Sequence, residues 1–191
     1  FSSATFFMVL AAISGGEFLL SNLDISDSQG DKMVLDYLKN MGASIEYTQS
    51  GISIKGGDLK GIEIDMNATP DALPAMAVAG CFARGETRLV NVPQARLKET
   101  DRINVMCKEL KKMGADIEEL PDGLVIRHSK LKGCRVNGHD DHRVVMALAV
   151  AGLNTEGETV IDTAEAMNVT FPEFPELIAE CGGDIRVIEE N

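Results

Sequence analysis

The sequence predicts an α+β (α/β) fold in which one supersecondary unit of the βαβαββ type is used three times. Helical segments of small and apolar residues alternate along the chain with short strand-like runs. A glycine that opens a strand recurs at Gly16, Gly85 and Gly157, at intervals of about 70 residues, which is longer than an ordinary solenoid repeat. We therefore expect one domain with pseudo-threefold symmetry, buried central helices and outer sheets. Its units should span about residues 2–66, 67–138 and 139–191.

The first unit should begin with a small-and-apolar helix over residues 2–13, which ends at Gly15 and Gly16 because glycine suits a helix C-terminal cap. A strand over residues 17–23 should follow. An amphipathic helix closed by Gly42 comes next, and its inward face should consist of Met33, Leu35, Leu38 and Met41. The remaining strands are expected over residues 44–48, 52–55 and 61–66.

The second and third units repeat this order. The second should contain a helix over 70–83, a strand over 87–92, a helix over 102–113, and strands over 116–120, 124–128 and 134–137. The third should contain a helix over 141–153, a strand opened by Gly157, a helix over 172–180 and a last strand over 184–188. The first helix of each unit carries almost no charge after its opening turn, so it should be buried.

The composition limits the partners that this chain can have. Its formal net charge is -12, without a basic tail or stripe, which argues against nucleic acid and anionic membrane as partners. Its four cysteines are scattered, as expected for reduced thiols of a cytoplasmic protein without a metal site or disulfide framework. The longest apolar run, residues 6–13, is too short to cross a bilayer. The chain enters a helical pattern directly after Phe1, which suggests a cut inside a longer protein.

A charged stretch, residues 96–102, opens the second helix of the second unit, and five of its seven side chains are charged. If this helix begins near Lys98, then Lys98, Glu99 and Arg102 share one face of its first turn. Cations at a helix start oppose the helix dipole, so their presence suggests that an anion binds there. The alternative is an ordinary solvent-facing helix cap.

Further polar residues occupy corresponding helix starts. Asp71 follows a threonine and a proline that are typical of a cap, and Asp140 and Asp141 could also be caps. Arg143 could contact a ligand or pair with one of these two aspartates, and His142 could be structural or carry a proton. If the units surround one axis, we expect these residues to converge with the charged stretch on one wall of a cleft.

Several motifs resemble one enzyme family in order along the chain. They are Lys98-Glu-Thr-Asp-Arg-Ile103, Lys112-Met-Gly-Ala115, Asp140-Asp-His-Arg-Val144, Pro70-Asp71, Ser2-Ser-Ala-Thr5, Gln29-Gly-Asp31 and Thr170-Phe-Pro172. Together they resemble the 5-enolpyruvylshikimate-3-phosphate synthase family, of which this chain would be the C-terminal of two globular domains. The resemblance implies transfer of enolpyruvyl from phosphoenolpyruvate to the 5-hydroxyl of shikimate 3-phosphate, by addition and then elimination, without a metal or cofactor. It also implies an N-terminal partner domain, a monomer when complete, and no turnover by this chain alone.

The resemblance also implies roles for individual residues. Asp71 would be the base at the attacking hydroxyl, and Glu99 would move a proton at the phosphoenolpyruvate methylene. Lys98 would contact the shikimate hydroxyls, while Arg102 and Arg143 would hold the phosphoenolpyruvate carboxylate. The remaining residues expected at the substrates are Gln94, Asp141 and His142.

Two positions depart from the family pattern, and two other functions remain open. Gln94 stands where many members have Asn, and Val169 falls where some carry a Lys at the phosphate, which puts the phosphate grip and the response to glyphosate in doubt. A sister family with the same fold transfers enolpyruvyl to UDP-N-acetylglucosamine. The alternative of a different class is a non-catalytic anion-binding module.

Overall fold

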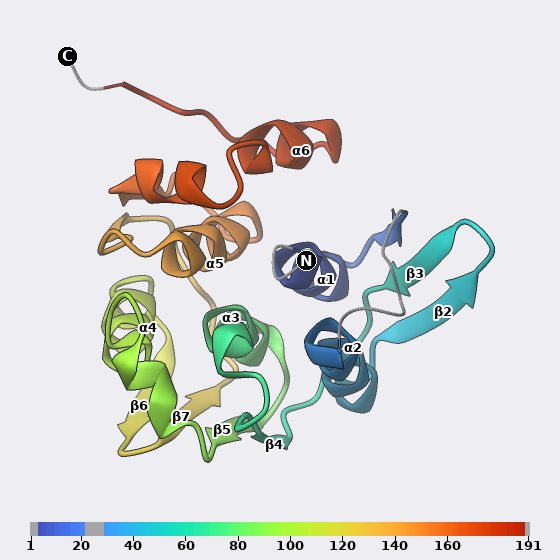
Figure 1. Ribbon diagram of the computed structural model, residues 1–191, viewed down its shortest axis with the longest axis horizontal. Helices are drawn as coiled ribbons and strands as arrows, with labels where there is room; N and C mark the ends of the chain where they lie inside the picture. The colour runs from blue at the N-terminus through green and yellow to red at the C-terminus, as the bar shows by residue number, and fades with distance from the viewer. Residues whose placement is uncertain (1–3, 22–28, 190–191) are drawn as a thin grey trace.

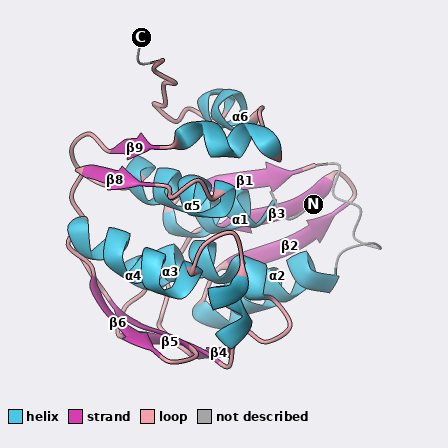
Figure 2. Cartoon of the chain, turned by 60° about the vertical axis from the view of Figure 1, so that its left-hand side comes forward, coloured by secondary structure: helices cyan, strands magenta, loops and turns pink. Residues whose placement is uncertain are grey.

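Helices and short strands alternate throughout the computed structural model, which describes residues 4–21 and 29–189. Within these residues the strands form three separate sheets, and the sheets lie outside a central group of helices (Figures 1 and 2). The expected mixed helix-and-strand fold is therefore confirmed. Residues 2–3, 22–23 and 28 of the expected elements and motifs lie outside the described part, as do the side chains of residues 29–31.

The centre of the molecule consists of α1 (Ala4–Ile13), α3 (Leu73–Phe82) and α5 (His142–Leu153), each of which contacts the other two. Figure 1 shows these helices nearly end-on. Every residue of α3 from Leu73 to Cys81 is buried, as is every residue of α5 from Arg143 to Ala151. A helix that is apolar on all sides can be stable only inside a core, so the prediction that these helices are buried is confirmed.

The first sheet has the strand order β1-β3-β2 and is antiparallel, with β1 (Glu17–Leu20), β2 (Ser44–Thr48) and β3 (Gly51–Lys55). Helix α2 (Gln29–Met41) contacts both α1 and β2. It ends as predicted, because Gly42 adopts φ +115 and the backbone N–H of Ala43 donates to the carbonyl of Leu38. The inward face of α2 also includes Val34, which we did not predict, while Met33 is only partly buried.

The second sheet has the order β4-β5-β7-β6, with β4 (Glu63–Asp65), β5 (Glu86–Val90), β6 (Asp116–Leu120) and β7 (Gly123–Arg127). Strand β4 pairs parallel with β5, and the other pairs are antiparallel. Helix α3 lies close to this sheet at Gly80, where an added Cβ would be 3.2 Å from the Cβ atoms of Thr87 and Ile126. Because β4 pairs with β5, these hydrogen bonds cross the expected unit boundary after residue 66.

The third sheet is a parallel pair, β8 (Arg135–Asn137) and β9 (Val160–Asp162), and it crosses the expected boundary after residue 138 in the same way. Helix α6 (Phe174–Glu180) follows and packs through Phe174 against Phe6, Phe7 and Phe171. The predicted last strand over 184–188 is wrong: the segment has no strand structure, and Val187 and Ile188 are exposed. Alternation alone does not make a strand when no sheet edge accepts its backbone.

The described residues contain no helix that is long and apolar enough to cross a membrane. They also contain no group of three or more His, Cys, Asp or Glu side chains placed to hold a metal ion. All four cysteines have free thiols.

Candidate functional site

The charged stretch is a loop that leads into a helix. The 3₁₀ helix η2 (Pro93–Leu97) follows β5, and α4 (Arg102–Lys112) begins only at Arg102. Asp101 is the N-cap, and its carboxylate accepts a hydrogen bond of 3.0 Å from the backbone N–H of Asn104. The predicted start at residue 102 is therefore confirmed. Lys98 and Glu99 lie before the helix, so the condition under which they would share its first turn is not met. Aspartate is among the strongest N-caps, and Asp101 could have been recognised as the start signal.

Arg96 holds this loop against the hairpin of β6 and β7. Its guanidinium donates to the carbonyls of Leu120 and Pro121, at 2.7 and 2.9 Å, and to the carboxylates of Asp101 and Glu119, at 2.8 and 2.7 Å. Because Asp101 is also the helix cap, one arginine fixes both the loop and the start of α4. Our sequence reasoning assigned no role to Arg96, because three of its four partners, Glu119, Leu120 and Pro121, belong to a distant hairpin.

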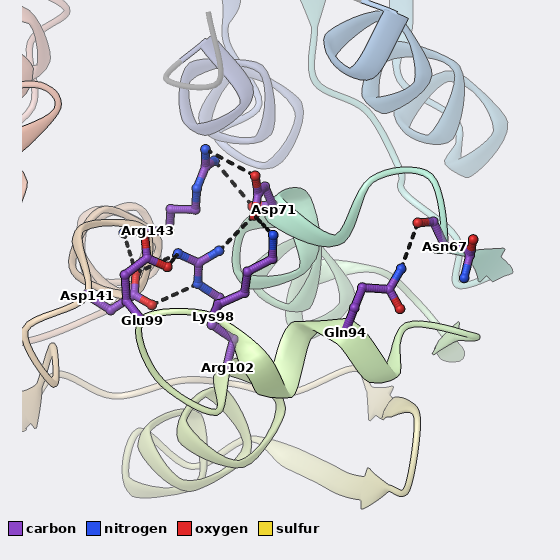
Figure 3. Close-up of polar contacts among 8 residues, drawn as sticks. All are labelled: Asn67, Asp71, Gln94, Lys98, Glu99, Arg102, Asp141 and Arg143. Atoms are coloured by element: carbon purple, nitrogen blue, oxygen red, sulfur yellow. Dashed lines mark hydrogen bonds and ion pairs between the residues drawn. The ribbon is translucent and has the colours of Figure 1, made fainter.

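Arg102 is the centre of the site (Figure 3). Its side chain is 1% exposed. Its Nε and Nη2 donate to the two carboxylate oxygens of Asp141, at 2.7 and 3.1 Å. Its Nη1 donates to Asp71 at 2.9 Å, and its Nη2 also donates to Glu99 at 2.5 Å. Four of its five N–H groups are therefore bonded to carboxylates from three segments of the chain.

Asp71 contacts three cationic side chains and lies in the 3₁₀ helix η1 (Pro70–Ala72). Besides Arg102, it forms ion pairs with Lys98 Nζ at 3.2 Å and with Arg143 Nη2 at 3.6 Å. Burial raises the pKa of Asp71, but the charges of Arg143, Lys98 and Arg102 lower it more, so its pKa lies below the usual aspartate value. Asp71 is therefore a carboxylate at neutral pH.

The capping expectations for this region had mixed outcomes. Thr69 stands at the N-cap position of η1 but makes no side-chain cap; its hydroxyl bonds instead with that of Tyr37 at 3.1 Å. Asp141 is the N-cap of α5, and its carboxylate accepts from the backbone N–H of Arg143 at 2.9 Å. The side chain of Arg143 pairs with Asp71 and not with Asp140 or Asp141, the two partners considered as one alternative from the sequence; contact with a ligand, the other alternative, stays a prediction.

Asp141 is fully buried, and Thr100 also donates to it at 3.3 Å. His142 is the first residue of α5 and is partly buried. Burial and then the charge of Arg143 lower the pKa of His142 below its usual value, so its ring is neutral at pH 7.

Gln94, which was predicted at the substrates, and Val169, which departs from the family pattern, lie away from these charged residues. Figure 3 shows Gln94 pointing toward Asn67, and its side-chain amide donates to the backbone carbonyl of Asn67 at 2.8 Å. Val169 ends the 3₁₀ helix η3 (Ala164–Val169) and is 85% exposed.

The cluster contains three cations and three carboxylates, namely Lys98, Arg102, Arg143, Asp71, Glu99 and Asp141. Each of these cations has a carboxylate partner within the chain. The binding of an anion at these helix starts stays a prediction. The side chains of Asp71 and Glu99 are 46% and 49% exposed, and that of Lys98 is 31% exposed. Solvent thus reaches the side chains of two acidic residues and a lysine beside a buried guanidinium, which is an arrangement suited to acid–base chemistry on a polar ligand.

Comparison with known proteins shows what this chain is similar to. The family model for EPSP synthase (3-phosphoshikimate 1-carboxyvinyltransferase) matches residues 1–178. The 3-phosphoshikimate 1-carboxyvinyltransferases of Ruminiclostridium cellulolyticum and Acetivibrio thermocellus are 73% and 69% identical to it, over 98% and 99% of this chain but 44% and 45% of their own lengths. The one from Methanocaldococcus jannaschii is 44% identical over 98% of this chain and 44% of its own length.

A solved structure of EPSP synthase from Acinetobacter baumannii matches with a TM-score of 0.89 and 36% sequence identity, over 98% of this chain and 47% of that chain. The chain thus spans about half the length of the relatives that it matches. The similarity covers nearly all of the chain in both sequence and fold. The chain belongs to the EPSP synthase family.

Proposed function

We propose that this chain provides one half of the active cleft of a 3-phosphoshikimate 1-carboxyvinyltransferase, which acts in chorismate and aromatic amino-acid biosynthesis. The reaction would transfer the enolpyruvyl group of phosphoenolpyruvate to the 5-hydroxyl of shikimate 3-phosphate and release phosphate. The observation that carries this proposal is the convergence of Asp71, Glu99, Arg102 and Arg143, from three separate segments, in a chain of this family.

In this proposal Asp71 is the base for the attacking hydroxyl. Its pKa, which lies below the usual aspartate value, keeps it ionised, and almost half of its side chain is open to solvent. The hydroxyl oxygen would bond to C2 of phosphoenolpyruvate while its proton passes to Asp71. Lys98 lies 3.2 Å from the same carboxylate, so it could hold the acceptor's hydroxyl groups beside this base.

Glu99, entering as the carboxylic acid, would deliver its proton to C3 of phosphoenolpyruvate during addition. The resulting carboxylate would remove a proton from C3 during elimination, when phosphate leaves C2 and takes up the proton held by Asp71. A carboxylate can serve in both directions if it is close to the carbon and free to change partners. Glu99 is free to change partners, since its side chain is half exposed and its ion pair is with Arg102.

Arg143 is the better placed of the two arginines to receive the phosphoenolpyruvate carboxylate. Its contacts with Asp71 are long, at 3.6 Å to the carboxylate and 3.4 Å to the backbone carbonyl, so its guanidinium keeps donors for a planar partner. Arg102 has only one N–H that is not bonded to a carboxylate of the chain. It could therefore give the phosphoenolpyruvate carboxylate a second hydrogen bond only if Glu99 or Asp71 moved away. His142 begins the same helix and would line this place as a neutral ring, with Asp141 behind it. Gln94 would act at the edge of the acceptor site.

We further infer that the fold is a pseudo-threefold array of βαβαββ units. The second sheet supports this, because β4, α3, β5, α4, β6 and β7 follow one another in that order. Three central helices that contact one another also fit a threefold arrangement. A complementary N-terminal domain would supply the rest of the cleft, and we expect the complete protein to be a monomer.

Turnover of a chimaera tests the proposal. The chain would replace the matching 44% of the Ruminiclostridium cellulolyticum relative, and phosphate release would be measured with phosphoenolpyruvate and shikimate 3-phosphate. We expect turnover by the chimaera and none by the isolated chain, because half of the cleft is then absent. Appreciable product from the isolated chain would contradict the half-site proposal.

Two variants of the chimaera test the assigned roles. Asp71→Asn and Glu99→Gln should each lower kcat by about 100-fold or more, which is the usual contribution of a positioned acid or base. Glu118→Gln is the matched control, because Glu118 is exposed on β6 and pairs with Arg127. Near-normal kcat values in both variants would contradict the roles proposed for Asp71 and Glu99.

The same assay separates the other two functions. Product formed with UDP-N-acetylglucosamine, and none with shikimate 3-phosphate, would support the sister reaction. Binding of phosphoenolpyruvate without product from either acceptor would support an anion-binding module. The relatives named above favour the shikimate reaction.

A further inference from the structure

Glu109 is a buried carboxylate that the proposed reaction does not use. It lies in α4, and its side chain is fully buried. Its oxygens contact Lys112 Nζ at 2.7 Å, His139 Nε2 at 2.9 Å and the backbone N–H of Asn137 at 3.0 Å. Two of these partners belong to one segment, residues 137–141, which connects β8 to α5. Glu109 therefore ties the middle of α4 to the segment that leads into α5.

This connecting segment has an unusual backbone conformation. His139 and Asp140 have φ values of +52 and +56, in a region that residues other than glycine adopt only at an energetic cost. Four further hydrogen bonds fix the segment. His139 N donates to the side chain of Asn137 at 2.7 Å and Asp140 N to the hydroxyl of Thr163 at 3.0 Å. Gly138 N donates to the carbonyl of Asp162 at 2.9 Å and Asp141 N to that of Gly138 at 3.0 Å. A conformation of this kind persists only when its surroundings determine it.

Helix α4 also contacts the other end of this segment, through the hydrogen bonds of Arg102 to Asp141. Arg102 and Glu109 are seven residues apart, which is about two helical turns, so they lie on one face of α4. Arg102 bonds Asp141 at one end of the segment, and Glu109 bonds Asn137 and His139 at the other. Helix α4 thus grips the segment at two points, and α5, with Arg143 in its first turn, follows directly.

We propose that Glu109 is a positioning residue that, through His139 and Asn137, fixes the start of α5 and so places Asp141 and Arg143 in the cluster. Without it, the segment would relax from its left-handed conformation, and Asp141 would move relative to Arg102. The consequence for turnover rests on the proposed function, while the effect on Arg102 does not. If Glu109 had only a structural role, its replacement would lower the stability of the whole chain. Hydrogen exchange at Arg102 and in the rest of the core would then increase by the same factor.

Hydrogen exchange at the Arg102 Nε–H, followed by NMR in this chain, reports the placement of Asp141 directly. The first variant is Glu109→Gln, which keeps the size but turns an NH₂ group toward one of the three donors. The second is His139→Gly, which removes the contact with Glu109 while giving the backbone the residue best suited to a positive φ. The matched control is Asp140→Gly, which relieves the same backbone cost one residue later at an exposed position. The backbone amides of α3 serve as the internal reference.

We expect exchange at the Arg102 Nε–H to be at least about tenfold faster, relative to the α3 amides, in Glu109→Gln and in His139→Gly. Asp140→Gly should stay within about twofold of the unmodified chain, because it removes no contact with Glu109. Parallel changes at Arg102 and α3, or equal effects of the two glycine variants, would overturn the proposal. If Glu109→Gln does not fold, the comparison of the two glycine variants decides alone.

In the chimaera, both contact-breaking variants should lower kcat by about 10- to 100-fold, because an error of about 1 Å in the position of a catalytic group costs a factor of that order. Asp140→Gly should not. If the unmodified chimaera shows no turnover, the proposed function fails, whereas the exchange measurement still decides the role of Glu109.

Discussion

Replacement of Arg102 by Met should destabilise this chain by about 3–5 kcal/mol at pH 7, the usual cost of leaving a buried charge without its partner. Asp141 is fully buried and receives two hydrogen bonds from Arg102. Asp71 and Glu99 would lose a partner too, but both are about half exposed and can be hydrated instead. Most of the loss should therefore come from Asp141.

A double-mutant cycle isolates this pair. Asp141→Asn removes the charge but keeps a side chain that can cap α5, since asparagine is as good an N-cap as aspartate. In the double variant, Arg102→Met with Asp141→Asn, neither member of this pair is left as an unpaired buried charge, so we expect at least about half of the loss to be recovered.

Urea denaturation of the four proteins at pH 7 gives the free energies of unfolding, provided that each transition is two-state. A cost below about 1 kcal/mol for Arg102→Met would refute the reasoning, as would a double variant as unstable as the sum of the single ones. Either result would mean that Asp141 is solvated or finds another partner in solution.

Two further predictions concern the groups around Arg102. The pKa of Asp71 is lowered in the folded chain, so its contribution to stability is present above the unfolded pKa of about 4 and is lost as the pH falls through the folded value. The difference in urea midpoint between the unmodified chain and Asp71→Asn should therefore shrink below about pH 4; a constant difference would contradict this. Arg96→Met should release the loop before α4 and speed tryptic cleavage after Lys98, whereas the exposed Arg84→Met control should not. Equal cleavage in both variants would show that Arg96 does not hold the loop.

The sequence was informative about helices and about which side chains would meet. Runs such as residues 73–82 have no polar face, so they could be placed in the core before any coordinates were known. Since their starts carry Asp71 and Arg143, it followed that these residues would lie together if the helices packed centrally. The last segment, 184–188, could not be judged in this way, because a strand depends on a sheet edge that the local sequence does not describe.

The pairing of charges could not be predicted, because each partner is brought by a different segment. For Arg143 the sequence left a ligand and an adjacent aspartate open as partners, yet its ion pair is with Asp71, which η1 brings to the start of α5. Arg96 and Glu109 escaped notice because most of their partners are 23 to 30 residues away in sequence; only Asp101 and Lys112, respectively, are close. Ion-pair partners follow from tertiary packing, whereas burial and helix ends follow from local pattern.

The completed pairing changes what anion binding would require. An external carboxylate can accept the one N–H that Arg102 has left, but a second hydrogen bond requires it to replace a carboxylate that is already there. Asp141 is the hardest to replace, since it is buried, caps α5 and also accepts from Thr100. Glu99 is the easiest, because it is half exposed and lies at the end of a loop. The affinity for an anionic ligand is therefore a difference between two similar interactions, and a ligand that displaces Glu99 also releases the carboxylate to which we assign the proton transfer.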